Sequence, residues 1–128
     1  MQDHTSDRGE AFSDVDPLPD VDPANFAALD MRVGRVVDVR PFAEARKPAY
    51  QLAVDFGPVL GVLETSAQVT NYRVEDLVGR LVVGAVNLGS RRIAGFVSRF
   101  LVLGAVEADG SVRLLRPDGD PPPGTRIA

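Results

Sequence analysis

Two short apolar runs in the second half of the chain place the strongest constraint on its fold. Residues 81–86 (LVVGAV) and 100–103 (FLVL) have the character of buried strands. The segment between them carries three arginines, Arg91, Arg92 and Arg99. A loop held between two buried strands would project fixed positive charge from a rigid sheet. This segment therefore predicts either a ligand-binding loop or a solvated turn.

Apolar residues predict three further strands before these two runs. The strands are residues 31–40, 50–56 and 59–63. The alternation of the first strand slips at Gly34, which predicts a β-bulge or a tight barrel bend there. In the second strand, Tyr50 and Phe56 share a face with leucine and valine, so core packing is favoured over base stacking for both.

Capping residues predict two helical segments. Asp22 followed by proline predicts a short N-terminal helix, which Phe26 and Leu29 would dock on the body of the protein. Thr65 and Ser66 are good N-cap residues, and they predict an irregular internal helix that ends at a glycine at position 79.

The order of these elements predicts the fold. Three strands, a helix and two strands make a five-stranded OB-fold, a small and partly open barrel. Asp109-Gly110 is a turn signal that adds a C-terminal hairpin of residues 105–108 against 112–115. We therefore expect an all-β fold with one short helix, a five-stranded OB-fold barrel and a C-terminal hairpin extension. The last residues, rich in proline and glycine, are expected to wrap the surface.

The loops that flank the ligand face of an OB-fold connect strands 1 and 2 and strands 4 and 5. Here they are residues 41–48, which contain Arg46 and Lys47, and residues 88–94, which contain the arginine pair. Both predicted loops are basic although the net charge of the chain is −4.

The negative charge is concentrated at the N-terminus. Residues 1–25 hold seven acids and one base, whereas residues 26–128 hold eleven acids and thirteen bases. We predict a disordered acidic tail over residues 1–22, because this segment is too polar to bury a core. Residues 23–128 then form a single domain.

The composition argues against several classes of function. The chain has no cysteine, which excludes thiol catalysis, cysteine-ligated zinc and iron–sulfur clusters. It has no apolar run long enough to span a membrane, so we expect a soluble, cytoplasmic protein. The one histidine, His4, lies in the predicted tail, and no phosphate-binding glycine loop is present. We expect no catalytic site, metal or cofactor, and therefore no enzyme.

Five segments, in this order and spacing, resemble one family. They are residues 29–34 (LDMRVG), 44–50 (EARKPAY), 65–72 (TSAQVTNY), 77–88 (LVGRLVVGAVNL) and 95–104 (GFVSRFLVLG). The family is the CsaA-type branch of the dimeric tRNA-binding domains, and the resemblance covers about residues 26–128. It implies an OB-fold homodimer with the N-terminal helix and C-terminal elements at the interface. It also implies two activities: binding of tRNA, and chaperone-like binding of unfolded or export-bound polypeptides.

The resemblance further implies polar contacts to RNA. Asn87 and Ser98 match polar positions near the RNA face of the family, and the basic loops lie beside that face. The expected RNA-binding residues are Arg46, Lys47, Asn87, Arg91, Arg92, Ser98 and Arg99. For the arginines, the alternative of solvated turns stays open.

Three aromatic residues are candidates for stacking on bases or contacting a peptide. They are Tyr50, Phe96 and Phe100. The last two are an even number of residues apart, so in a continuous strand they would share a face with Ser98. For Tyr50 core packing is the favoured interpretation, and for Phe96 and Phe100 it is the open alternative.

Overall fold

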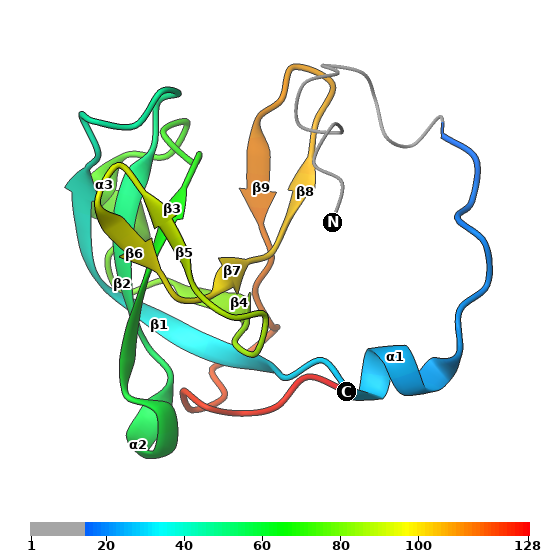
Figure 1. Cartoon of the computed structure of the whole chain (residues 1–128). Helices are drawn as coiled ribbons and strands as arrows, with labels where there is room; N and C mark the ends of the chain where they lie inside the picture. The colour runs from blue at the N-terminus through cyan, green and yellow to red at the C-terminus, as the bar shows by residue number, and fades with distance from the viewer. Residues whose placement is uncertain (1–14) are drawn as a thin grey trace.

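The fold is seen in a computed structural model, which describes residues 15–128. A five-stranded antiparallel sheet curls into a nearly closed barrel, with the strand order β3-β2-β1-β4-β7 (Figure 1). The strands are β1 (Met31–Pro41), β2 (Tyr50–Asp55), β3 (Val62–Ala67), β4 (Leu81–Ala85) and β7 (Leu101–Val102). The predicted OB-fold barrel is therefore confirmed. Most of the predicted acidic tail, with His4, lies outside the described residues, and residues 15–22 are exposed.

Two hairpins and three short helices accompany the barrel. The hairpins are β5 (Arg91–Ile93) with β6 (Phe96–Ser98), and β8 (Gly104–Val106) with β9 (Val112–Leu114); the helices are α1 (Pro23–Ala27), α2 (Gly57–Leu60) and α3 (Val74–Leu77). The predicted C-terminal hairpin is confirmed, and Gly110 in its turn has the positive φ of 89° that favours glycine. The predicted loop of residues 88–94 is in part a strand, β5.

The predicted helix starting at Thr65 is wrong, because this residue lies in β3 and is buried. Its hydroxyl donates a hydrogen bond of 2.7 Å to the carbonyl of Phe100 and lies 2.9 Å from the hydroxyl of Ser98. The backbone N–H of Arg99 donates to the carbonyl of Glu64 at 2.8 Å. These bonds close the barrel between β3 and the segment that joins β6 to β7. Between residues 65 and 79, where the helix was predicted, helical structure is confined to α3.

Aromatic side chains fill the barrel where two glycines make room for them. Phe56 and Phe100 are buried and meet edge to face, with their ring centroids 4.9 Å apart. A Cβ on Gly34 would lie 2.8 Å from the ring of Phe56, and a Cβ on Gly84 would lie 2.8 Å from each of these two rings. Both aromatic rings therefore depend on glycine in the neighbouring strands. The register shift of β1 falls between Val36 and Asp38, slightly after the predicted slip at Gly34.

The N-terminal helix forms where it is predicted but does not dock through both predicted residues. The carboxylate of Asp22 accepts a hydrogen bond from the N–H of Ala24, which caps α1. Leu29 packs against a small cluster around Met31, as expected, whereas Phe26 is 49% exposed and α1 buries no residue. Figure 1 shows α1 apart from the barrel, on an N-terminal arm that continues beyond it. The predicted docking of Phe26 on the same chain is therefore wrong.

The C-terminal segment wraps the barrel, as predicted. The N–H of Gly124 donates to the carbonyl of Val33, and the N–H of Val33 donates to the carbonyl of Thr125, both at 2.8 Å. The N–H of Ile127 donates to the carbonyl of Met31 at 2.9 Å. This segment covers the first half of β1, which β2 does not reach. Within residues 15–128 no helix is long and apolar enough to cross a membrane.

Candidate nucleic-acid interface

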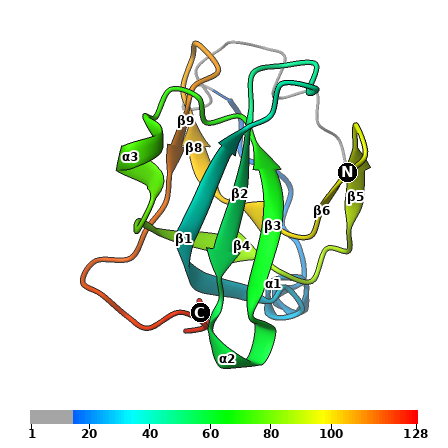
Figure 2. The same ribbon diagram turned by 90° about the vertical axis from the view of Figure 1, so that its left-hand side faces the viewer.

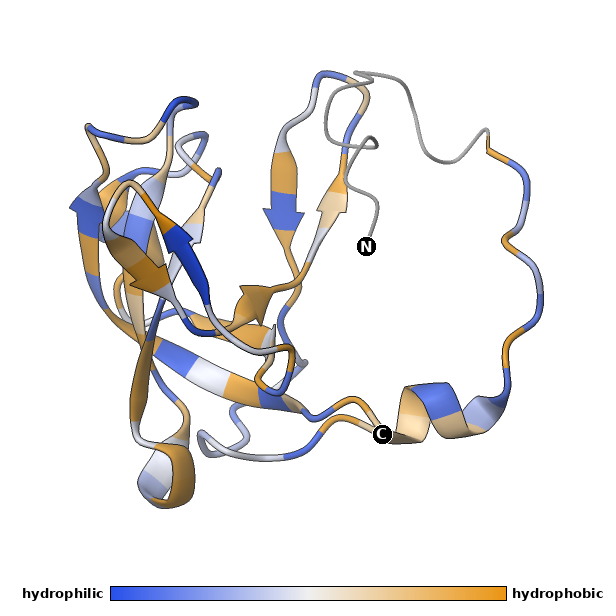
Figure 3. Ribbon diagram, in the orientation of Figure 1, coloured by the Kyte–Doolittle hydropathy of each residue, from blue (hydrophilic) through white to orange (hydrophobic). Residues whose placement is uncertain are grey.

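An aromatic contact brings the two predicted basic segments together. Phe42 begins the loop between β1 and β2, and Phe96 begins β6. Their ring centroids lie 5.4 Å apart, with the ring planes tilted by 59°. The hairpin of β5 and β6 is therefore anchored on the β1–β2 loop, and the two basic segments share one region of the surface. In Figure 3 both the start of β5 and the tip of this loop are strongly hydrophilic.

The two faces of the β5–β6 hairpin carry different side chains. Arg91 pairs with Ser98, Arg92 with Val97, and Ile93 with Phe96. Because side chains alternate along a strand, Arg91 shares a face with Phe96 and Ser98, whereas Arg92 points to the other face. Adjacent arginines in sequence are therefore presented in two directions. Such a hairpin can contact two separate phosphate groups more easily than one.

The β1–β2 loop is closed at its base by a hydrogen bond, and its residues line a shallow cavity. Phe42 is 4% exposed, and its N–H donates to the carbonyl of Ala49 at 3.1 Å. A cavity of about 340 Å³ opens beside the loop, and its lining includes Arg46, Tyr50 and Thr70. The hydroxyl of Tyr50 donates to the carbonyl of Tyr72 at 2.9 Å, which fixes the ring at the cavity wall. Arg46 and Lys47 are exposed at the tip.

The exposed arginines of this surface lack carboxylate partners within the described part of the chain. No ion pair involves Arg46, Arg91, Arg92 or Arg99 among residues 15–128, and all four are exposed. The guanidinium of Arg92 donates only a long hydrogen bond of 3.4 Å, to the carbonyl of Gly95. By contrast, Arg73 and Arg113 elsewhere are paired with carboxylates at 3.0 and 2.9 Å. These four arginines can therefore accept an anionic ligand without breaking an ion pair within residues 15–128.

Three of the predicted site residues have structural contacts inside the chain. Ser98 is 8% exposed and bonded to Thr65, and Phe100 is 4% exposed in the core. The amide of Asn87 accepts from the N–H of Asp30 and donates to the carbonyl of Ala28, both at 2.8 Å. These residues position the hairpin, the core and the start of β1. Their side chains are therefore less available for contact with a ligand than the exposed arginines are.

A local ion pair strengthens the junction that Asn87 holds. Arg32 donates to both carboxylate oxygens of Asp30, at 2.8 and 3.1 Å. These hydrogen bonds hold the pKa of Asp30 below its ordinary value. The carboxylate therefore stays ionised and belongs to the α1–β1 junction rather than to a catalytic pair. No group of histidine, cysteine or acidic residues within residues 15–128 is arranged to hold a metal ion.

Sequence reasoning missed Phe42, the residue that joins the two basic segments. Its only sequence signal is an aromatic residue at the start of a basic loop. Its partner is 54 positions away, so local patterns contain no information about their contact. The opposite orientations of Arg91 and Arg92 were also missed, because this segment was predicted as a loop rather than as a strand with alternating faces.

Comparisons with known proteins find a related family and similar structures. The family described as "Putative tRNA binding domain" matches residues 31–126. The structure of the CsaA chaperone protein from Picrophilus torridus is 41% identical in sequence, with a TM-score of 0.81, and the match covers 85% of this chain and 100% of that one. The chaperone CsaA from Bacillus anthracis str. Ames is 44% identical, with a TM-score of 0.82 and coverage of 86% and 100%.

Methionine–tRNA ligases also contain a similar segment. The enzyme from Methanosarcina acetivorans is 34% identical over 113 residues, which are 88% of this chain and 16% of the ligase. The enzyme from Protochlamydia amoebophila is 34% identical over 117 residues, 15% of its length. The chain thus spans about one sixth of the length of these curated relatives.

Proposed function

Since the chain belongs to the family of tRNA-binding domains, we propose that it binds tRNA, as a homodimeric and non-catalytic module. The observation that carries the proposal is the contact between Phe42 and Phe96, which joins two basic segments on one region of the surface. The proposed RNA contacts are the exposed residues Arg46, Lys47, Arg91, Arg92 and Arg99. The loop cavity beside Tyr50 and the partly exposed ring of Phe96 supply apolar surface for a base.

The chemistry of this surface suits phosphate recognition more than base reading. Guanidinium groups bind phosphate oxygens through paired, charge-assisted hydrogen bonds. Contacts of this kind position an RNA without reading its sequence. We therefore expect a preference for the shape of a folded RNA, with a strong dependence on salt concentration.

Dimerisation is part of the same proposal. The arm of residues 15–30 leaves the barrel with apolar side chains in solvent, among them Leu18 at 88%, Val21 at 68% and Phe26 at 49% exposure. Apolar residues on an extended arm are stabilised when a second copy of the chain covers them. A dimer would also double the number of phosphate contacts. A cytoplasmic location, where tRNA is abundant, belongs to this proposal too.

A binding titration tests the proposed interface. Gel-shift affinity for tRNA is measured for the wild type, for Arg91→Gln/Arg92→Gln, and for the control Arg73→Gln/Arg113→Gln, which removes the same charge from exposed sites elsewhere. We expect the hairpin variant to bind at least about tenfold more weakly, because charge-assisted hydrogen bonds contribute about 1.5–3 kcal/mol each. The control should change affinity much less. Equal affinities of the two variants would refute the interface.

The likeness to CsaA chaperones favours a second candidate function. Both structures at 41% and 44% identity are named chaperones, and they match over their whole length. We propose as the alternative that the dimer holds unfolded or export-bound polypeptides in a groove. Suppression of the aggregation of a chemically unfolded client by equimolar dimer supports this function. Unchanged aggregation, together with no heat of peptide binding in calorimetry, would remove it.

A further inference from the structure

A second basic cavity lies away from the RNA interface proposed above. It has a volume of about 310 Å³ and is formed by Arg35 of β1, residues 79–81 after α3, and residues 116–120 after β9. In Figure 2, α3 and the C-terminal segment lie on one side of the barrel and the β5–β6 hairpin on the other. The cavity is therefore not part of the surface formed by the β5–β6 hairpin.

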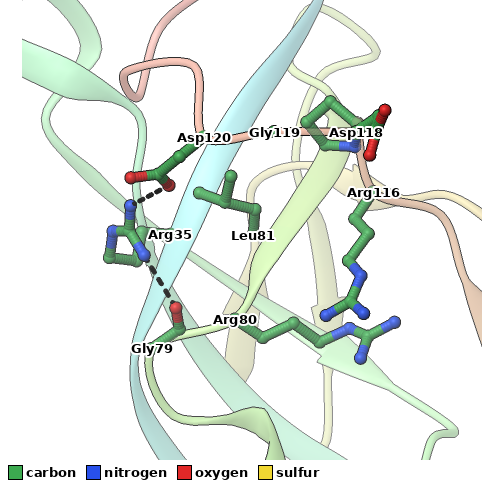
Figure 4. Close-up of a pocket in the computed structure, with 9 residues that line it drawn as sticks. Arg35, Gly79, Arg80, Leu81, Arg116, Asp118, Gly119 and Asp120 are labelled. Carbon is green, nitrogen blue, oxygen red and sulfur yellow. Dashed lines mark hydrogen bonds and ion pairs between the residues drawn. The ribbon is translucent and has the colours of Figure 1, made fainter.

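The backbone around this cavity is held at several points. The N–H of Val36 donates to the carbonyl of Arg80 at 2.9 Å, and the N–H of Gly79 donates to the carbonyl of Val36 at 2.8 Å. Arg35 donates to the carbonyl of Gly79 at 2.8 Å and to the carboxylate of Asp120 at 2.9 Å. Arg35 thus links two walls of the cavity, and its charge is compensated by Asp120 (Figure 4).

Arg80 presents a fixed guanidinium with an unused donor. Its Nη2 donates to the carbonyl of Leu114 at 3.3 Å, and its guanidinium carbon lies 5.2 Å from the centre of the Tyr72 ring. Its Nε is buried and finds no hydrogen-bond acceptor among the described residues. This Nε has no exposed surface for a ligand, whereas Nη1 makes no hydrogen bond among the described residues and is not buried, so it is the donor that an incoming oxygen atom can reach.

Arg116 adds a second charge, which no carboxylate among residues 15–128 compensates. It is exposed, and within residues 15–128 it makes no hydrogen bond or ion pair. In Figure 4 its side chain points toward the guanidinium of Arg80, whereas Asp118 is directed away from both. Two like charges therefore share one cavity and form no ion pair within residues 15–128, although Asp118 also lines the cavity. An anion between them would replace this repulsion by two attractions.

We propose that this cavity is a binding site for a phosphate group, held by Arg80 and Arg116. A tetrahedral phosphate offers oxygens in several directions, which suits guanidinium groups that arrive from two different segments. The volume is about that of ten waters, at roughly 30 Å³ each, so a phosphate and part of the molecule that carries it can be accommodated. Arg35 and Asp120 are positioning residues that keep the walls in place.

The test is a calorimetric titration of the full chain with inorganic phosphate at constant ionic strength. The wild type should bind one phosphate per chain, and Arg116→Gln should weaken the binding by about tenfold or more, as expected for one lost charge-assisted hydrogen bond. Arg113→Gln, an exposed change of the same kind outside the cavity, should leave the affinity unchanged. Arg80→Lys keeps the positive charge but loses the paired donors of the planar guanidinium, so it should also weaken phosphate binding.

The absence of saturable binding, or equal binding by Arg116→Gln and Arg113→Gln, would overturn the site. Because this titration contains no RNA, its result does not depend on whether the protein binds tRNA. Measuring tRNA affinity of Arg116→Gln over a range of salt then identifies the source of the phosphate. A salt slope reduced by about one unit assigns the site to an RNA phosphate, and an unchanged slope assigns it to a free phosphorylated molecule.

Discussion

Replacement of Thr65 by valine tests how the barrel is closed. Thr65 is 2% exposed, and valine has nearly the same shape, so the change removes a hydroxyl without opening a large cavity. Two hydrogen bonds are lost, one of 2.7 Å to the carbonyl of Phe100 and one of 2.9 Å with the hydroxyl of Ser98. Each contributes about 1 kcal/mol net, and Ser98 is left with a poorer partner. We expect a loss of about 2–3 kcal/mol in the free energy of unfolding.

The assay is equilibrium unfolding in urea at one fixed protein concentration, since dimerisation would make stability depend on concentration. Thr70→Val is the matched control, because Thr70 is exposed, and it should stay within about 0.5 kcal/mol of the wild type. Thr65→Val/Ser98→Ala should be less destabilised than the sum of the single changes, since both partners are then apolar. If Thr65→Val matched the wild type, or if the two changes were additive, this account of barrel closure would be refuted.

Three further changes test other parts of the structure. Gly34→Ala places a Cβ 2.8 Å from the ring of Phe56 and should cost about 1–3 kcal/mol in urea unfolding; a neutral effect would contradict the close approach. Asn87→Ala removes two hydrogen bonds of 2.8 Å, so the backbone amide of Asp30 should exchange with solvent faster, and unchanged exchange would argue against this contact. Asp30→Asn should be less stable than the wild type at neutral pH. Arg32 lowers the pKa of Asp30 in the folded state. The greater stability of the wild type is therefore present above the pKa that Asp30 has in the unfolded chain, and it is lost as the pH falls through the lower pKa of the folded state. A stability difference that stays constant on acidification below about pH 4 would contradict this.

The elements that depend on local patterns were predictable from the sequence. The cap at Asp22, the turn at Asp109-Gly110 and the alternation of residues 50–56 involve neighbours within a few positions. The order of these elements was enough to predict the OB-fold and the two basic loops beside its ligand face. Local capping preference also led to the wrong helix at Thr65, because a hydroxyl that caps a helix can equally bond across a barrel.

The contacts that shape the candidate site join residues far apart in sequence. Phe42 meets Phe96, and Thr65 meets Ser98 at a separation of 33 positions. No periodicity encodes such pairs, so neither the joining of the two basic segments nor the barrel closure could be predicted from one sequence. The exposed position of Phe26 is likewise a property of packing, since the same apolar residue suits docking on its own barrel or on a second copy.

The most direct test of the proposed function is the salt dependence of tRNA affinity. The slope of the logarithm of the binding constant against the logarithm of salt concentration reports the number of phosphates neutralised. For Arg91→Gln/Arg92→Gln we predict a slope shallower than that of the wild type by about one to two units per protomer, as two phosphate contacts are lost. Identical slopes for the variant and the wild type would contradict the claim that the arginines of this hairpin contact RNA phosphates.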